Sequence, residues 1–144
     1  MARSSFRLKT LLQMREQRRD HHRARLAQAL RDDEAIAQCQ ADLDRQRREL
    51  CARSRASAGP GELDMERLTE YSRHDQLLAV EREQLEAQRQ QAARRIDRRR
   101  AALLAADREV RVIEKLEQRQ SQRLAEQEKR YEIMTLDEVA SRRG

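Results

Sequence analysis

The chain has 144 residues, of which 40% are charged and only 2% are aromatic, with three glycines, one proline and no tryptophan. So few large apolar side chains cannot fill a thick core, which argues against a compact globular enzyme. The 32 basic and 26 acidic residues give a net charge of +6, which permits an acidic partner without choosing among nucleic acid, an anionic membrane surface and an acidic protein.

The first 19 residues contain no apolar signal core followed by a small-residue cleavage site, so we interpret them as a mature cytoplasmic N-terminus. No run approaches the roughly 18 apolar residues that a membrane-spanning helix needs. Cys39 and Cys51 would lie about 18 Å apart along one helix, which is beyond the reach of a disulfide. This spacing indicates free thiols in a reducing compartment.

A first helix is predicted over residues 6–56, because apolar side chains recur there at seven-residue intervals. One heptad series contains Leu8, Ala29, Ile36, Leu43 and Leu50. The companion series holds Leu12 and Leu26 but is otherwise polar, so this seam is the weaker of the two. Gly59, Pro60 and Gly61 cannot continue a helix, which predicts a turn at residues 57–61.

A second helix is predicted over residues 62–140. Glu62, Asp64 and Glu66 lie at its start, where negative charge suits the positive end of the helix dipole. Its two heptad series are stronger than those of the first helix and contain Tyr71, Leu78, Leu85, Ala92, Ala106 and Ile113, and Ile96, Leu103, Val110, Leu124 and Tyr131. The pattern is typical of a coiled coil.

Folding the chain at the turn pairs both seams in one antiparallel register. The predicted pairs are Leu50 with Tyr71, Leu43 with Leu78, Ile36 with Leu85, Ala29 with Ala92, His22 with Arg99, Arg15 with Ala106 and Leu8 with Ile113. The predicted fold is therefore all-α, a single long antiparallel two-helix coiled-coil hairpin over residues 1–144. Beyond Ile113, about 25 residues of the second helix should overhang without an intramolecular partner. Apolar side chains on this overhang indicate an external partner, either a second copy or a different protein.

The residue pattern favours no catalytic, cofactor or metal site. No glycine outside the turn and the last residue could build a phosphate loop, and His21 and His22 point to different sides of a helix. The five arginines at positions 94, 95, 98, 99 and 100 could contact phosphates. Because no aromatic residue for base stacking is interleaved with them, we interpret the run as a solvated helix face rather than a nucleic-acid site.

Several segments, in the same order and spacing, resemble the FliJ family of flagellar export proteins. Residues 6–30, FRLKTLLQMREQRRDHHRARLAQAL, resemble the family's opening helix. Residues 101–120, AALLAADREVRVIEKLEQRQ, resemble its most recognisable block, and residues 136–143, LDEVASRR, resemble its terminal pattern. The segment ERLTEYSRHDQLL resembles the start of the family's second helix.

This resemblance implies a non-catalytic stalk of the flagellar type III export apparatus, cytoplasmic and peripherally associated with the inner membrane. Its implied partners are the export ATPase hexamer, the cytoplasmic domain of the membrane export gate, and export chaperones, with no nucleic acid and no small-molecule substrate. The positions matching or extending the family's ATPase-ring end are Leu8, Leu11, Leu12, Arg15, Ile113, Leu116, Arg119, Leu124, Tyr131, Leu136, Asp137 and Glu138. Those matching its gate and chaperone side are Tyr71, His74 and Leu78, although His74 stands where the family often has an aromatic residue.

Alternative interpretations remain open at this point. Stalk proteins of the injectisome share the same shape, and a coiled coil that self-associates through the overhang would have the same heptads. A basic nucleic-acid-binding helix is a third hypothesis, which predicts salt-sensitive binding to random DNA.

Overall fold

The computed structural model describes residues 2–57 and 64–144, and they form two long helices. Helix α1 spans Ala2–Ser57 and helix α2 spans Met65–Arg143. Both are rich in arginine, glutamate, glutamine, leucine and alanine, and neither contains a glycine or proline that would interrupt it. The predicted all-α fold, a helical hairpin of two helices packed against each other, is confirmed.

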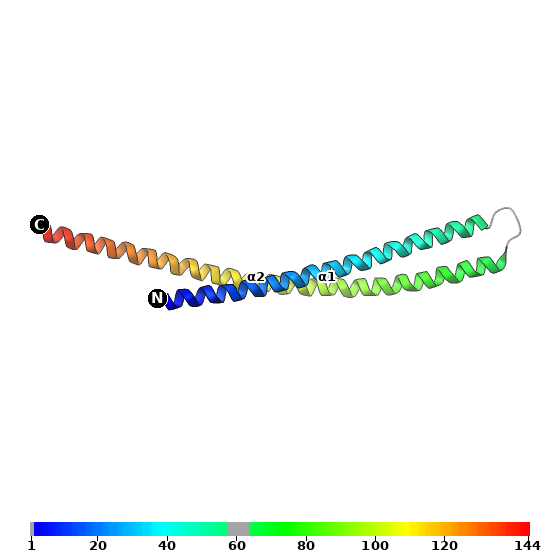
Figure 1. Ribbon diagram of the computed structural model, residues 1–144, viewed down its shortest axis with the longest axis horizontal. Helices are drawn as coiled ribbons and strands as arrows, with labels where there is room; N and C mark the ends of the chain where they lie inside the picture. The colour runs from blue at the N-terminus through cyan, green and yellow to red at the C-terminus, as the bar shows by residue number, and fades with distance from the viewer. Residues whose placement is uncertain (1, 58–63) are drawn as a thin grey trace. The chain divides into compact units, whose positions relative to one another are not determined.

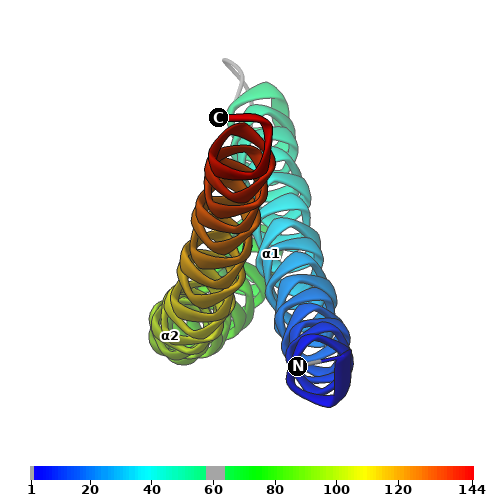
Figure 2. The same cartoon turned by 90° about the vertical axis from the view of Figure 1, so that its left-hand side faces the viewer.

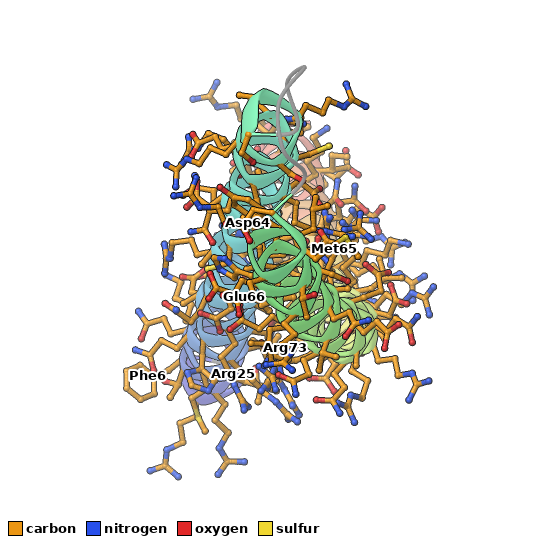
Figure 3. All side chains as sticks on the ribbon, turned by 90° about the vertical axis from the view of Figure 1, so that its right-hand side faces the viewer. Phe6, Arg25, Asp64, Met65, Glu66 and Arg73 are labelled. Carbon is orange, nitrogen blue, oxygen red and sulfur yellow. The ribbon has the colours of Figure 1, made fainter. Side chains whose placement is uncertain are left out.

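The helix ends differ slightly from the predicted bounds. Helix α1 begins four residues before the expected position 6. Helix α2 begins at Met65, later than the expected position 62, because Asp64 caps its N-terminus. The Asp64 carboxylate accepts a hydrogen bond from the Glu66 N–H at 3.2 Å, and its carbonyl accepts one from the Leu68 N–H at 3.2 Å. Such an N-cap sets the first turn of the helix at this point (Figure 3). Residues 58–61 of the predicted turn lie outside the described residues.

The helices contribute to two units. A central unit comprises residues 24–100, and a terminal unit comprises the described residues up to Arg23 together with residues 101–144. Each unit contains one stretch of α1 and one stretch of α2 (Figure 1). In the central unit the contacts Arg47–Asp75 and Arg89–Asp33 show that the two stretches run antiparallel.

The core of the central unit is a cluster formed by Leu43, Leu50 and Leu78, with Tyr71 and Leu85 packed against it. This cluster brings together the predicted partners Leu43 with Leu78 and Leu50 with Tyr71. Both helices contribute apolar seam residues, so water is excluded along a narrow line rather than from a thick core.

Polar contacts flank this seam in the central unit. Gln40 is buried, donates a hydrogen bond to the Glu86 carboxylate at 3.0 Å and accepts one from Arg89 at 3.2 Å. A satisfied polar residue in a seam favours one register, because any slip would leave its amide without partners. The ion pair Arg82–Asp44, at 2.8 Å, also joins the two helices.

In the terminal unit, Ala106, Val110 and Ile113 of α2 form the buried part of the seam. Arg15 of α1 donates a hydrogen bond to Glu109 at 2.9 Å, and Gln120 donates one to the Ser4 hydroxyl at 2.7 Å. Interhelical contact in this unit therefore extends past Ile113, where the prediction ended it. The physical reason is that α1 begins at Ala2 and so supplies extra residues opposite α2.

Candidate partner-binding surfaces

The overhang proper begins after Leu124, which is half-buried, because every residue from 125 to 144 is exposed. Figures 1 and 2 show this part of α2 in orange to red, running on to the C-terminus. Its exposed large apolar side chains are Tyr131, Ile133, Met134, Leu136 and Val139. Tyr131 is 73% exposed and Leu136 is 68% exposed. Exposing several large apolar side chains together is unfavourable in water unless a partner covers them.

Acidic residues lie among these apolar side chains. Asp137 and Glu138 are exposed and follow Leu136 directly. The overhang therefore offers apolar contact area together with carboxylates, a combination typical of a protein-binding surface with an apolar centre and a polar rim.

The predicted ring-end residues of the terminal unit divide into seam residues and surface residues. Ile113 is only 5% exposed, while Leu8, Leu12 and Arg15 are half-buried, so these four hold the two helices together. Leu11, Leu116 and Arg119 are exposed and free to meet another molecule.

A shallow groove of about 520 Å³ lies in this same unit. Its lining combines Ser5 and Lys9 of α1 with Glu117, Gln120 and Leu124 of α2. The groove reaches Leu124, one of the predicted ring-end residues and the last residue before the exposed overhang. Phe6, the single phenylalanine of the chain, also projects into solvent beside this stretch of α1 (Figure 3), with 72% of its surface exposed. The sequence analysis included Phe6 in a family motif but not among the site residues. An aromatic side chain at a position outside the heptad series, and therefore away from the seam, could have indicated its exposure.

The central unit holds a second groove, of about 490 Å³, next to the leucine cluster. It is lined by Tyr71, Ser72 and Asp75 of α2 and by Arg47, Arg48, Leu50, Cys51 and Ser54 of α1. Of the three predicted gate-side residues, Tyr71 lines this groove, His74 is exposed and Leu78 is buried in the core. Sequence reasoning missed the α1 wall, because its residues belong to a different helix from the motif that pointed here.

An ion pair forms one edge of this groove. Arg47 donates two hydrogen bonds to Asp75, Nε to Oδ1 at 2.9 Å and Nη2 to Oδ2 at 3.2 Å. These hydrogen bonds lower the pKa of the Asp75 carboxyl and raise the pKa of the Arg47 guanidinium. Both groups therefore stay charged over the physiological range, and the groove presents a fixed pair of opposite charges beside an apolar floor.

Within the part of the chain that the structure describes, no group of three or more His, Cys, Asp or Glu side chains could hold a metal ion. Cys39 and Cys51 are free and exposed. Neither described helix is long and apolar enough to cross a membrane.

Comparison with known families gives a match that covers almost the whole chain. The family model described as flagellar FliJ protein matches residues 4–144. Searches of curated proteins and of solved structures found no match.

Proposed function

The chain belongs to the flagellar FliJ protein family, and we propose that it is a stalk that binds the export ATPase ring and couples it to the export gate and export chaperones. The family makes the chain a component of the flagellar export apparatus. The FliJ family consists of non-enzymatic structural or adaptor proteins. The observation that carries the proposal is the overhang, residues 125–144, whose large apolar side chains are all exposed.

The ring-binding surface in this proposal consists of the overhang and the exposed residues of the terminal unit. Tyr131 and Leu136 supply apolar anchors, and Asp137 and Glu138 supply charges beside Leu136. Arg119 supplies a further charge on the part of α2 that packs against α1. Exposed apolar anchors with a charged rim are the features that dominate protein–protein affinity. Ile113, Leu8 and Leu12 support this surface by packing the helices that carry it.

The proposed effect on the ATPase follows from symmetry. Two antiparallel helices have no six-fold axis, so they cannot contact six identical subunits in the same way. Contacts that differ between subunits stabilise different conformations of those subunits. A stalk can thereby stimulate ATP hydrolysis without holding any catalytic residue of its own.

For the gate, we propose the groove of the central unit. Tyr71 and Leu50 give it an apolar floor, the Arg47–Asp75 pair gives it polarity at one edge, and His74 is exposed one helical position before Asp75. A partner side chain with an apolar body and a polar end would match this lining. Export chaperones are proposed to bind on this same side.

Self-association through the overhang is the second candidate function, because a second copy could also cover Tyr131 and Leu136. The oligomeric state of the free protein distinguishes ATPase binding from self-association. Sedimentation of the purified chain at micromolar concentration should show a monomer if the overhang is reserved for the ATPase, and a stable dimer if copies of the chain cover it.

The ring-binding proposal is tested with two variants of matched exposure. Ile133→Ser with Leu136→Ser removes apolar contact from the overhang, where these side chains are 58% and 68% exposed. Leu77→Ser with Val80→Ser is the control, with side chains 65% and 52% exposed in the central unit. The measurement is the rate of ATP hydrolysis by the purified export ATPase in the presence of each variant. The overhang variant should lose most of the stimulation and the control should keep it; equal stimulation by both would refute the assignment.

A further inference from the structure

Charge is segregated within the central unit. Residues 32–93 contain 14 acidic and nine basic residues, whereas residues 94–100 contain five arginines and one aspartate. On the α1 side, residues 24–31 add two arginines and no acidic residue. The excess positive charge of this unit is therefore concentrated at one place along its two helices.

Six of these side chains form what we call the arginine cluster: Arg25, Arg94, Arg95, Arg98, Arg99 and Arg100. None of the six lies within 4 Å of a carboxylate among the residues that the structure describes. Elsewhere in the same unit, Arg47, Arg82 and Arg89 each pair with an aspartate across the seam, at distances of 2.9, 2.8 and 3.5 Å. Other arginines of this unit, such as Arg53 and Arg73, are exposed at separate places along the helices, whereas the six of the arginine cluster lie together.

Arg99 is the member of the arginine cluster whose charge is most unfavourably placed for the stability of the fold. It is half-buried at a seam position that a stable coiled coil would fill with an apolar side chain. Burial lowers the pKa of its guanidinium, and the positive charges of Arg25, Arg95 and Arg98 lower that pKa further. Like charges held together across two helices destabilise the fold unless an anion neutralises them.

Three members of the arginine cluster line a small cavity that is open to solvent. Arg25, Arg95 and Arg99 line it together with Gln28, Ala29 and Asp32, and its volume is about 200 Å³. Gln28 donates a hydrogen bond to Asp32 at 2.9 Å and accepts one from Arg31 at 2.9 Å, so these polar groups are already satisfied along α1. The remaining guanidinium groups have donors available for an incoming anion.

We propose that the arginine cluster binds an acidic segment of a partner protein, with a carboxylate entering the cavity between Arg25, Arg95 and Arg99. The guanidinium geometry matches a carboxylate, which accepts two parallel hydrogen bonds. Asp32 in the same lining repels any anion, but a peptide can place a backbone N–H against the second carboxylate oxygen of Asp32, which the hydrogen bond from Gln28 leaves available. A phosphate backbone carries no such donor, so the lining favours a protein segment.

The distribution of the arginines also favours a protein. At about 100° per residue, Arg94 and Arg98 lie on one side of α2, Arg95 and Arg99 on the next, and Arg100 on a third. A flat anionic membrane would reach only one of these sides. The residues 24–31 and 94–100 contain no aromatic side chain on which bases of a single strand could stack. None of the six arginines belongs to the ring-end or gate surface, so this site is additional to the proposed stalk function.

The test uses the full-length chain and a short fluorescein-labelled poly-glutamate peptide as the probe, with affinity measured by fluorescence anisotropy near physiological salt. The variant Arg25→Gln, Arg95→Gln, Arg99→Gln removes the cavity lining. A matched control, Arg53→Gln, Arg55→Gln, Arg73→Gln, removes the same number of charges from exposed positions of the same unit. We expect the cavity variant to weaken peptide binding about tenfold or more, since several charge-assisted hydrogen bonds are lost, and the control to change it less than twofold.

Two further measurements make the outcome decisive. Thermal melting should show the cavity variant to be at least as stable as the unchanged chain, because like-charge repulsion is removed, so lost binding would not reflect lost folding. Equal weakening by both variants would overturn the proposal, since only net charge would then matter. The proposal is also overturned if a random DNA duplex, or vesicles containing phosphatidylglycerol, bind more tightly than the peptide and lose binding selectively in the cavity variant.

Discussion

Leu43→Ala measures how much the apolar seam contributes to the stability of the hairpin. Leu43 is 6% exposed and packs with Leu50 and Leu78. The substitution removes three carbon atoms, and at about 0.8 kcal/mol for each buried group the loss of transfer free energy is about 2.4 kcal/mol. A seam of two helices can close partly over the vacated space, so the expected loss in the free energy of unfolding is about 2–3 kcal/mol, the low end for a core leucine.

Leu136→Ala is the matched control, because the chemical change is identical and the side chain is 68% exposed. Alanine is at least as favourable as leucine in a helix, so propensity does not destabilise either variant. We expect the control to change the free energy of unfolding by about 0.5 kcal/mol or less.

Both variants are compared by urea unfolding followed by far-UV circular dichroism. The midpoint should fall for Leu43→Ala with little change in slope, and stay in place for Leu136→Ala. Equal losses in the two variants would refute the reasoning, because they would show that the overhang is packed in the free protein.

Three further predictions concern the central unit. Arg99→Leu should raise the melting temperature, since it removes a half-buried charge repelled by neighbouring arginines; a lower melting temperature would contradict this account. The pKa of Asp75 is lower in the folded state, so the stability that its pairing with Arg47 contributes is present above the unfolded-state pKa and is lost as pH falls through the folded value. Asp75→Asn should therefore lose stability at neutral pH, and the difference from the unchanged chain should shrink as pH falls below the unfolded-state pKa of aspartate, measured by thermal melting across pH. Leu43→Cys combined with Leu78→Cys, with both native cysteines replaced, should form a disulfide within the monomer on mild oxidation, and cross-links only between molecules would disprove the register.

The heptads were sufficient to predict the helices and the central core, because apolar residues at seven-residue spacing have one stable solution in a chain with a single turn signal. Leu43 with Leu78, and Leu50 with Tyr71, can therefore be paired from their spacing alone. The spacing places Gln40 at a polar seam position, but its burial could not be predicted from its type, since that burial depends on the partners Glu86 and Arg89 that the fold places beside it.

The extent of the overhang was harder to predict. It depends on where α1 begins, and the start of a helix rich in arginine and serine has no strong capping signal. The Gln120–Ser4 contact moves the end of the paired region by several residues. The groove beside Tyr71 could not be predicted either. Its other wall contains Leu50 and Cys51 of α1, and only the packing of the two helices places them beside Tyr71.

Site-specific photo-cross-linking from position 131 tests the central claim most directly. Tyr131 is replaced by the photoreactive amino acid p-benzoylphenylalanine, and Leu77, which is also exposed, provides the comparison position. Irradiation in the presence of the purified export ATPase should join position 131 to an ATPase subunit and leave position 77 unlinked to it. A cross-link from position 131 only to a second copy of the chain, or an ATPase cross-link from position 77 alone, would contradict the account.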